Sequence, residues 1–107
     1  MRKGLTEAVE KIVADELIAA NAAFPAFNSR HEGYAVMLEE AQEARDEMQE
    51  IGMQTKIIWD MVKENAQKDV FLTRLGELKE TAQNMAAEAI QLAAMSEKFI
   101  QFFEGRE

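Results

Sequence analysis

Apolar side chains recur at helical spacing from the start of the chain. Leu5, Val9 and Ile12 lie three and four residues apart, which places them on one face of a helix. This pattern predicts a first helix over 5–23. The helix should end before Pro25, because a residue that precedes proline is disfavoured in the helical region.

The second helix has a clear start signal. Ser29 and Glu32 form a Ser-x-x-Glu capping box directly before a periodic segment. We expect this helix to run to about Ile51, with Gly52 as its C-terminal stop. A shorter third helix is predicted over 55–67.

A fourth helix is predicted from Val70 or Thr73 to about Phe103. The alternation of β-branched and polar residues that is typical of strands is absent. At 107 residues the chain is long enough for one domain. The sequence therefore predicts a single all-α domain over 1–107, an antiparallel bundle of about four helices that is small enough to favour oligomers.

Charge and cysteine content narrow the range of partners. The net charge is −8, and an acidic chain without a basic stripe repels nucleic acid and anionic membranes. The absence of cysteine excludes disulfides, zinc–thiolate sites and a thiol nucleophile. The charged N-terminus is unlike a signal peptide, and no apolar run reaches membrane-spanning length. We expect a cytoplasmic protein that binds neither nucleic acid nor membrane.

One carboxylate lies in an unusual place. Glu88 falls within 85–95, a stretch that is apolar almost all round and therefore typical of a buried helix. Gln91 lies on the same face. No lysine or arginine occurs between Glu80 and Glu97. A buried, unpaired carboxylate is costly, so Glu88 needs a partner from another helix or a metal ion.

The second predicted helix offers acid rather than base. Glu39, Glu40 and Glu43 form Glu-Glu-x-x-Glu, a pattern that alone is usually a solvated helix face. If this helix packs against the last one, these carboxylates converge on Glu88 and Gln91. Like charges in a dry site require a counter-ion, and hard oxygen ligands suit Mg²⁺ or Mn²⁺. The combination favours a metal site, while a purely structural partner for Glu88 stays open.

These two motifs carry a family resemblance. The chain resembles the MazG-like, all-α nucleoside triphosphate pyrophosphohydrolase superfamily, which uses Glu-Glu-x-x-Glu on one helix and Glu-x-x-Asp on a later one. The first motif is intact at 39–43, and the second reads Glu-Ala-Ile-Gln at 88–91, with Gln91 in place of the aspartate. The stretches 29–36 and 88–95 look most like phage and prophage members.

The resemblance implies a site and a reaction. Glu40, Glu43 and Glu88 would be ligands of Mg²⁺ (or Mn²⁺), and Gln91 a weak fourth ligand or a water-holder. Glu39 would be a further ligand or the catalytic residue that orients the attacking water. The implied substrate is a nucleoside triphosphate, hydrolysed to monophosphate and pyrophosphate. The implied assembly is a homodimer or homotetramer.

Two other functions stay open. A non-catalytic helical oligomer of phage or prophage origin would keep the fold and lose the reaction, and the uncharged Gln91 favours it. A plain antiparallel coiled-coil adaptor predicts solvent-facing carboxylates and leaves Glu88 unexplained. A di-iron bundle needs Glu-x-x-His on two helices, whereas His31 is the only histidine.

The remaining aromatic and basic residues have weaker assignments. Phe24, Phe27 and Asn28 are expected to pack at the helix junction, with stacking on a nucleobase as the alternative. Trp59 and Met61 are expected in the core. The aromatic cluster at 99–103 predicts a subunit contact. The candidates for phosphate binding are Lys56, Arg74 and Lys79.

Overall fold

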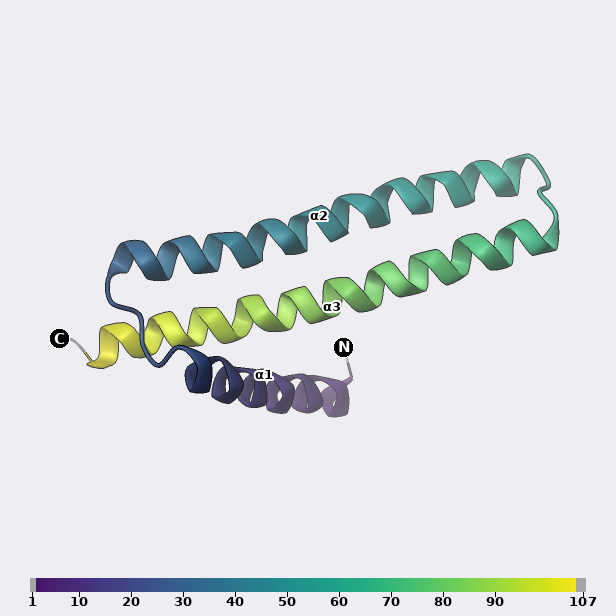
Figure 1. Cartoon of the computed structure of the whole chain (residues 1–107). Coiled ribbons are helices and arrows are strands. Elements are labelled where there is room, and N and C mark those ends of the chain that lie inside the picture. The colour runs from purple at the N-terminus through teal and green to yellow at the C-terminus, as the bar shows by residue number, and fades with distance from the viewer. Residues whose placement is uncertain (1, 106–107) are drawn as a thin grey trace.

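The computed structural model describes residues 2–105 and contains three helices (Figure 1). They are α1 (Lys3–Ala23), α2 (Arg30–Lys63) and α3 (Lys68–Gly105). The helices α2 and α3 form a long antiparallel hairpin, and α1 lies along the C-terminal part of α3 (Figure 1). No strand occurs within 2–105, so the predicted all-α class is confirmed.

The predicted start of α2 is confirmed. The Ser29 side chain accepts a hydrogen bond from the Glu32 backbone N–H over 3.1 Å. The Glu32 carboxylate in turn accepts from the Asn28 backbone N–H over 2.9 Å. Before this cap, α1 ends at the predicted place, because Phe24 is extended ahead of Pro25. These contacts fix the short connection from α1 to α2.

The predicted helix break at Gly52 is wrong. The chain stays helical through this residue, and the separate helix expected over 55–67 is mostly the C-terminal part of α2. A glycine inside a helix costs only about 1 kcal/mol relative to alanine. Buried residues of α2 occur on both sides of the glycine, at Ala44 and Gln54. The continuous packing of α2 on α3 therefore outweighs the local preference.

The turn of the hairpin comes later, at Asn65. This residue has a φ of 53°, in the left-handed region that asparagine tolerates better than most residues. The Ala66 N–H donates to the Met61 carbonyl over 3.0 Å, and the Asn65 N–H donates to the Val62 carbonyl over 3.3 Å. These two hydrogen bonds form a Schellman motif, which ends α2 and allows α3 to begin at Lys68.

The contact between α2 and α3 follows a heptad pattern. Positions one heptad apart on α2 are all buried or half-buried, namely Gly33, Glu40, Glu47, Gln54 and Met61. The matching series on α3 is Arg74, Thr81, Glu88, Met95 and Phe102. Such positions are apolar in an ordinary coiled coil. Here the middle of the seam is polar.

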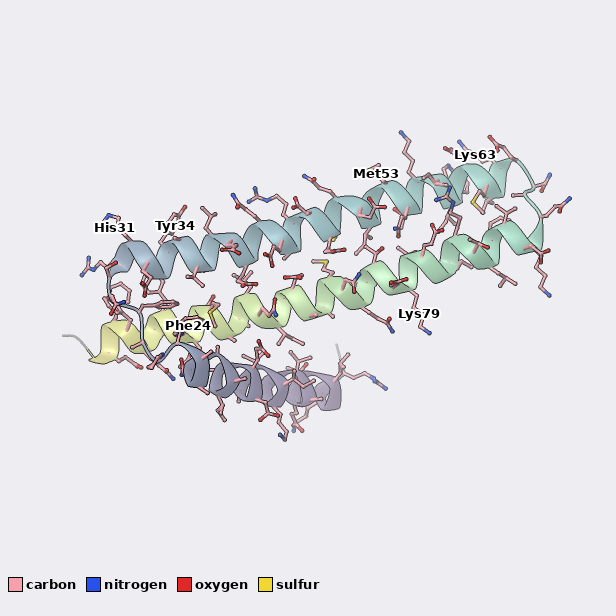
Figure 2. All side chains as sticks on the ribbon, viewed as in Figure 1. Phe24, His31, Tyr34, Met53, Lys63 and Lys79 are labelled. Atoms are coloured by element: carbon pink, nitrogen blue, oxygen red, sulfur yellow. The ribbon has the colours of Figure 1, made fainter. Side chains whose placement is uncertain are left out.

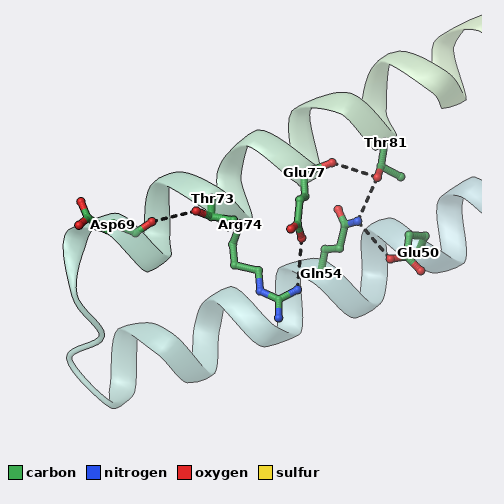
Figure 3. A network of polar contacts seen from close by, with 7 residues as sticks. All are labelled: Glu50, Gln54, Asp69, Thr73, Arg74, Glu77 and Thr81. Atoms are coloured by element: carbon green, nitrogen blue, oxygen red, sulfur yellow. Dashed lines mark hydrogen bonds and ion pairs between the residues drawn. The ribbon is translucent and has the colours of Figure 1, made fainter.

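The polar seam includes a buried amide. Gln54 Nε2 donates to Thr81 Oγ1 over 3.0 Å across the hairpin and to Glu50 Oε1 over 3.1 Å (Figure 3). Thr81 Oγ1 donates to the Glu77 carbonyl over 3.0 Å. Gln54 Oε1 is buried and has no hydrogen-bond partner. The pair thus connects the two helices but leaves one polar atom unsatisfied.

The apolar core lies where α1 meets the hairpin. Phe27, Ala94 and Met95 are its buried residues. The Phe99 ring packs edge-on against Phe27, with 6.0 Å between the ring centroids. Gly33 of α2 lies directly against Phe99. Part of the aromatic cluster expected at a subunit contact therefore belongs to the core of the chain itself.

The rest of the molecule buries little apolar surface. Its Cα radius of gyration is 18.1 Å, whereas a compact domain of this length has about 13 Å. The prediction that Trp59 lies in the core is wrong, since 58 % of it is exposed, while Met61 is buried as predicted. Within the described range, no helix is long and apolar enough to cross a membrane.

Candidate metal centre

Three carboxylates from two helices converge near the middle of the hairpin. Glu40 and Glu43 project from successive turns of α2, and Glu88 projects from α3. One oxygen of each lies within 4.8 Å of the others. The predicted packing of the two motif-bearing helices is thus confirmed, and the three acidic residues assigned as ligands lie together.

The Gln91 amide faces two of these carboxylates, Glu40 and Glu88. With its amide nitrogen turned toward them, Nε2 donates to Glu40 Oε2 and Glu88 Oε2 over 3.2 Å each. In the opposite orientation Oε1 faces the two carboxylates with no donor between them. With the nitrogen toward the carboxylates, the amide is satisfied by hydrogen bonds. With the oxygen toward them, it is satisfied by a bound cation. The amide can therefore serve the cluster both with and without a metal ion.

The crowding of negative charge changes the protonation of Glu88. Hydrogen bonding to the Glu43 side chain raises the pKa of Glu88 above its ordinary value. Burial and the charge of Glu43 raise this pKa further, and so do the charges of Glu40 and Glu47. A divalent cation bound beside Glu43 and Glu88 would relieve the same repulsion.

Burial is the main cause of the raised pKa of Glu40. The negative charges of Glu43, Glu39 and Glu16 raise this pKa further. The charge of Glu16 on α1 therefore acts on the cluster, although its carboxylate is not among the three that converge. A site with this excess of negative charge attracts cations and repels anions unless a cation is bound.

The sequence interpretation missed Glu16 and Glu47. Glu16 lies one helical turn from Val13 and Ala20, which pack against the core, so the face of α1 that docks also carries this carboxylate. Glu47 lies one turn beyond Glu43 on α2. The helical spacing of Glu16 and Glu47 relates both residues to the site. This relation can be recognised only when the docked face of α1 and the packed face of α2 are known.

Other predicted residues lie outside the cluster. Glu39 is exposed and is not among the three converging carboxylates, although its charge acts on Glu40. Arg74 forms an ion pair with Glu77 over 3.3 Å, in the hairpin half far from Glu88. Lys79, labelled in Figure 2, is exposed in the same half. Lys56 is exposed on α2, 13 residues after Glu43. The structure thus brings none of the three predicted phosphate-binding residues to the site.

The donor set fits a hard divalent cation. Three carboxylates and one amide oxygen are the ligand types that Mg²⁺ and Mn²⁺ prefer, and water completes such a shell.

Comparison with protein-family models, curated proteins and solved structures gives no match for this chain. Its chemistry is therefore inferred from the residues of this cluster.

Proposed function

We propose that the chain is a divalent-metal-dependent nucleoside triphosphate pyrophosphohydrolase. The observation that carries the proposal is the convergence of Glu40, Glu43 and Glu88 within 4.8 Å, with the Gln91 amide facing two of them. These are the motif positions from which the sequence resemblance implied metal ligands.

In this proposal each residue has a defined role. Glu40, Glu43 and Glu88 hold Mg²⁺ or Mn²⁺, and Gln91 turns its amide oxygen toward the ion. A bound divalent ion supplies neutralisation of phosphate charge and activation of water. Glu39, which is exposed and next to Glu40 in the sequence, would orient the attacking water.

The electrostatics make activity depend strictly on the ion. A triphosphate carries several negative charges, and the cluster presents only carboxylates and one amide. Lys79 lies nine residues from Glu88 along α3, which is about 13 Å at the helical rise. Arg45 follows Glu43 by two residues on α2 and is exposed to solvent. Without a bound cation the substrate is repelled, so chelation should abolish turnover.

A second candidate function follows from Gln91. Its amide nitrogen can bridge Glu40 and Glu88 by two hydrogen bonds of 3.2 Å, which satisfies the cluster without metal. This metal-free arrangement supports a non-catalytic helical oligomer. In that case the carboxylates serve packing alone.

Self-association into a homodimer or homotetramer is part of both proposals. The hairpin half that α1 does not cover exposes large apolar side chains on both helices, including Met53, Trp59, Leu72 and Leu75. Covering such surface is a strong driving force for association. Sedimentation equilibrium should therefore give a mass of at least twice 12.1 kDa.

Pyrophosphate release decides between the two functions. Canonical and damaged triphosphates are each incubated with the protein and Mg²⁺ or Mn²⁺, and pyrophosphate is measured. We expect release in wild type, none in Glu88→Gln, and unchanged release in Glu80→Gln, whose side chain is exposed on α3. No release from any triphosphate would instead favour the non-catalytic oligomer.

A further inference from the structure

A cavity of about 660 Å³ lies at the junction of α1 with the hairpin, outside the acidic cluster. Its volume is within the range of about 300–1,000 Å³ that small-molecule sites occupy. The walls are mostly apolar and come from all three helices and the connection between α1 and α2. They include Ala20, Phe24, Phe27, Val36, Met95 and Lys98.

Lys98 is the unusual member of this wall. Only 6 % of the residue is exposed, although lysine is almost never buried without an ion-pair partner. Its Nζ donates to the Phe24 carbonyl and lies 4.8 Å from the centroid of the Phe27 ring. An ammonium has three N–H donors, so these contacts do not exhaust its capacity.

No carboxylate of the described residues forms an ion pair with Lys98. The acidic residue of the cavity wall is Glu32, and its carboxylate forms hydrogen bonds with Asn28. It accepts from the Asn28 backbone N–H over 2.9 Å and from Asn28 Nδ2 over 3.4 Å. The cavity therefore combines apolar walls with one buried positive charge that lacks a counter-ion.

We propose that this cavity binds an organic monoanion with an apolar body, whose carboxylate or similar head group pairs with the Lys98 ammonium. The head group supplies the missing negative charge, and the apolar body covers the Phe27 and Met95 side of the wall. Such a charge-assisted hydrogen bond is stronger than a neutral one. The site needs no metal ion and is independent of the proposed hydrolysis.

Octanoate, octanol and octylamine test the proposal as matched probes that share one hydrocarbon chain. Titration calorimetry measures the affinity, and NMR of the methionine methyl groups locates the site, with Met95 expected to shift and exposed Met53 expected not to. We expect octanoate to bind at least about tenfold more tightly than octanol, the factor that a charged hydrogen bond supplies. Octylamine should not bind measurably.

Lys98→Met separates a binding role from a structural one. It should abolish the preference for octanoate over octanol and also raise the melting temperature, because an unpaired buried charge is removed. Lys98→Arg should keep the preference, and Lys79→Met on the exposed face of α3 should change neither property. Octanoate binding should also survive in Glu88→Gln and in chelator.

The proposal is overturned if octanoate binds no more tightly than octanol, or if Lys98→Met keeps the preference. It is equally overturned if the Met95 methyl group does not shift on binding. A lower melting temperature for Lys98→Met, with no charge preference in wild type, would assign Lys98 a purely structural role in holding the Phe24 carbonyl.

Discussion

The two ends of the helical hairpin are held together by different means. Where α1 docks, three elements surround Phe27, Ala94 and Met95, and the Phe99 ring closes against Gly33. At the opposite end only α2 and α3 meet, and their contact includes the Gln54–Thr81 hydrogen bond. The first end is an apolar core, whereas the second is a two-helix seam with a polar centre.

This difference shows where the stability of the chain resides. Apolar burial contributes about 25 cal/mol per Å², so the three-helix end should supply most of the folding free energy. The two-helix end exposes Trp59, Leu72 and Leu75 and should open locally at low cost. The acidic cluster lies between the two regions, where α1 still contributes Glu16. The three-helix core therefore restrains the acidic cluster on one side, whereas the two-helix end restrains it less on the other.

Truncation of the core should have the largest effect. Phe27→Ala removes a buried ring and should lower the free energy of unfolding by about 3–5 kcal/mol. Trp59→Ala, at the exposed aromatic residue of the other end, should cost less than about 1 kcal/mol when the protein is dilute enough to be monomeric. Urea unfolding followed by circular dichroism measures both. Equal losses of unfolding free energy in the two variants would show that the two ends contribute equally to stability.

Glycine substitutions sharpen the same contrast. A Cβ at Gly33 would lie 2.6 Å from two ring carbons of Phe99. Gly33→Ala should therefore destabilise by about 1–2 kcal/mol, since overpacking outweighs the gain in helix propensity. Gly52→Ala meets no atom within 4 Å and should stabilise by about 0.5–1 kcal/mol. Thermal melting of the two variants should shift in opposite directions.

These cases also show how far the sequence could predict the fold. Capping at Ser29, the end of α1 at Pro25 and the meeting of Glu40 with Glu88 all follow from local spacing and complementary faces. The prediction of a helix end at Gly52 failed because whether a glycine ends a helix depends on how that helix packs against its partner. The true turn at Asn65 carried a weaker local signal.

The residues that the sequence could not assign depend on the docking of α1. Glu16 adds to the acidic cluster, and Lys98 becomes buried, because α1 and the connection after it lie against α3. The spacing of Lys98 from Met95 places it on the packed face of α3, but a lysine there is expected to direct its ammonium to solvent. Such positions become apparent only when three elements are placed together.

Replacement of the buried amide tests why the two-helix end is weak. Gln54→Leu removes the buried Oε1 that lacks a partner, and Thr81 keeps its hydrogen bond to the Glu77 carbonyl. We expect a gain of about 1 kcal/mol, because an unsatisfied buried polar atom costs about 1–3 kcal/mol. Thr81→Val should instead lower stability, since it deprives Gln54 Nε2 of a partner. A loss in Gln54→Leu would contradict this view of the seam.

The pH dependence of the cluster should be the smallest effect. Because the folded pKa of Glu88 is raised above 4.5, the folded state binds more protons than the unfolded state between the two values. Stability should therefore fall as the pH rises from 4.5 through the folded pKa. Solvent screening should keep the change below about 1 kcal/mol. In chelator, Glu88→Gln should flatten this decline, and an unchanged profile would show that the pKa of Glu88 is not raised in the folded state.

Thermal melting with and without divalent metal tests the central claim most directly. Wild type, Glu88→Gln and Gln91→Asp are melted in chelator and then with Mg²⁺ or Mn²⁺. Wild type should melt higher with the ion, because a ligand that binds only the folded state stabilises it. Gln91→Asp should melt lower than wild type in chelator and gain more from the ion, since it adds a negative charge beside Glu88. Glu88→Gln should melt higher in chelator and gain nothing. If no protein responds to either ion and Glu88→Gln melts like wild type, the carboxylates hold no metal and the proposed hydrolysis is wrong.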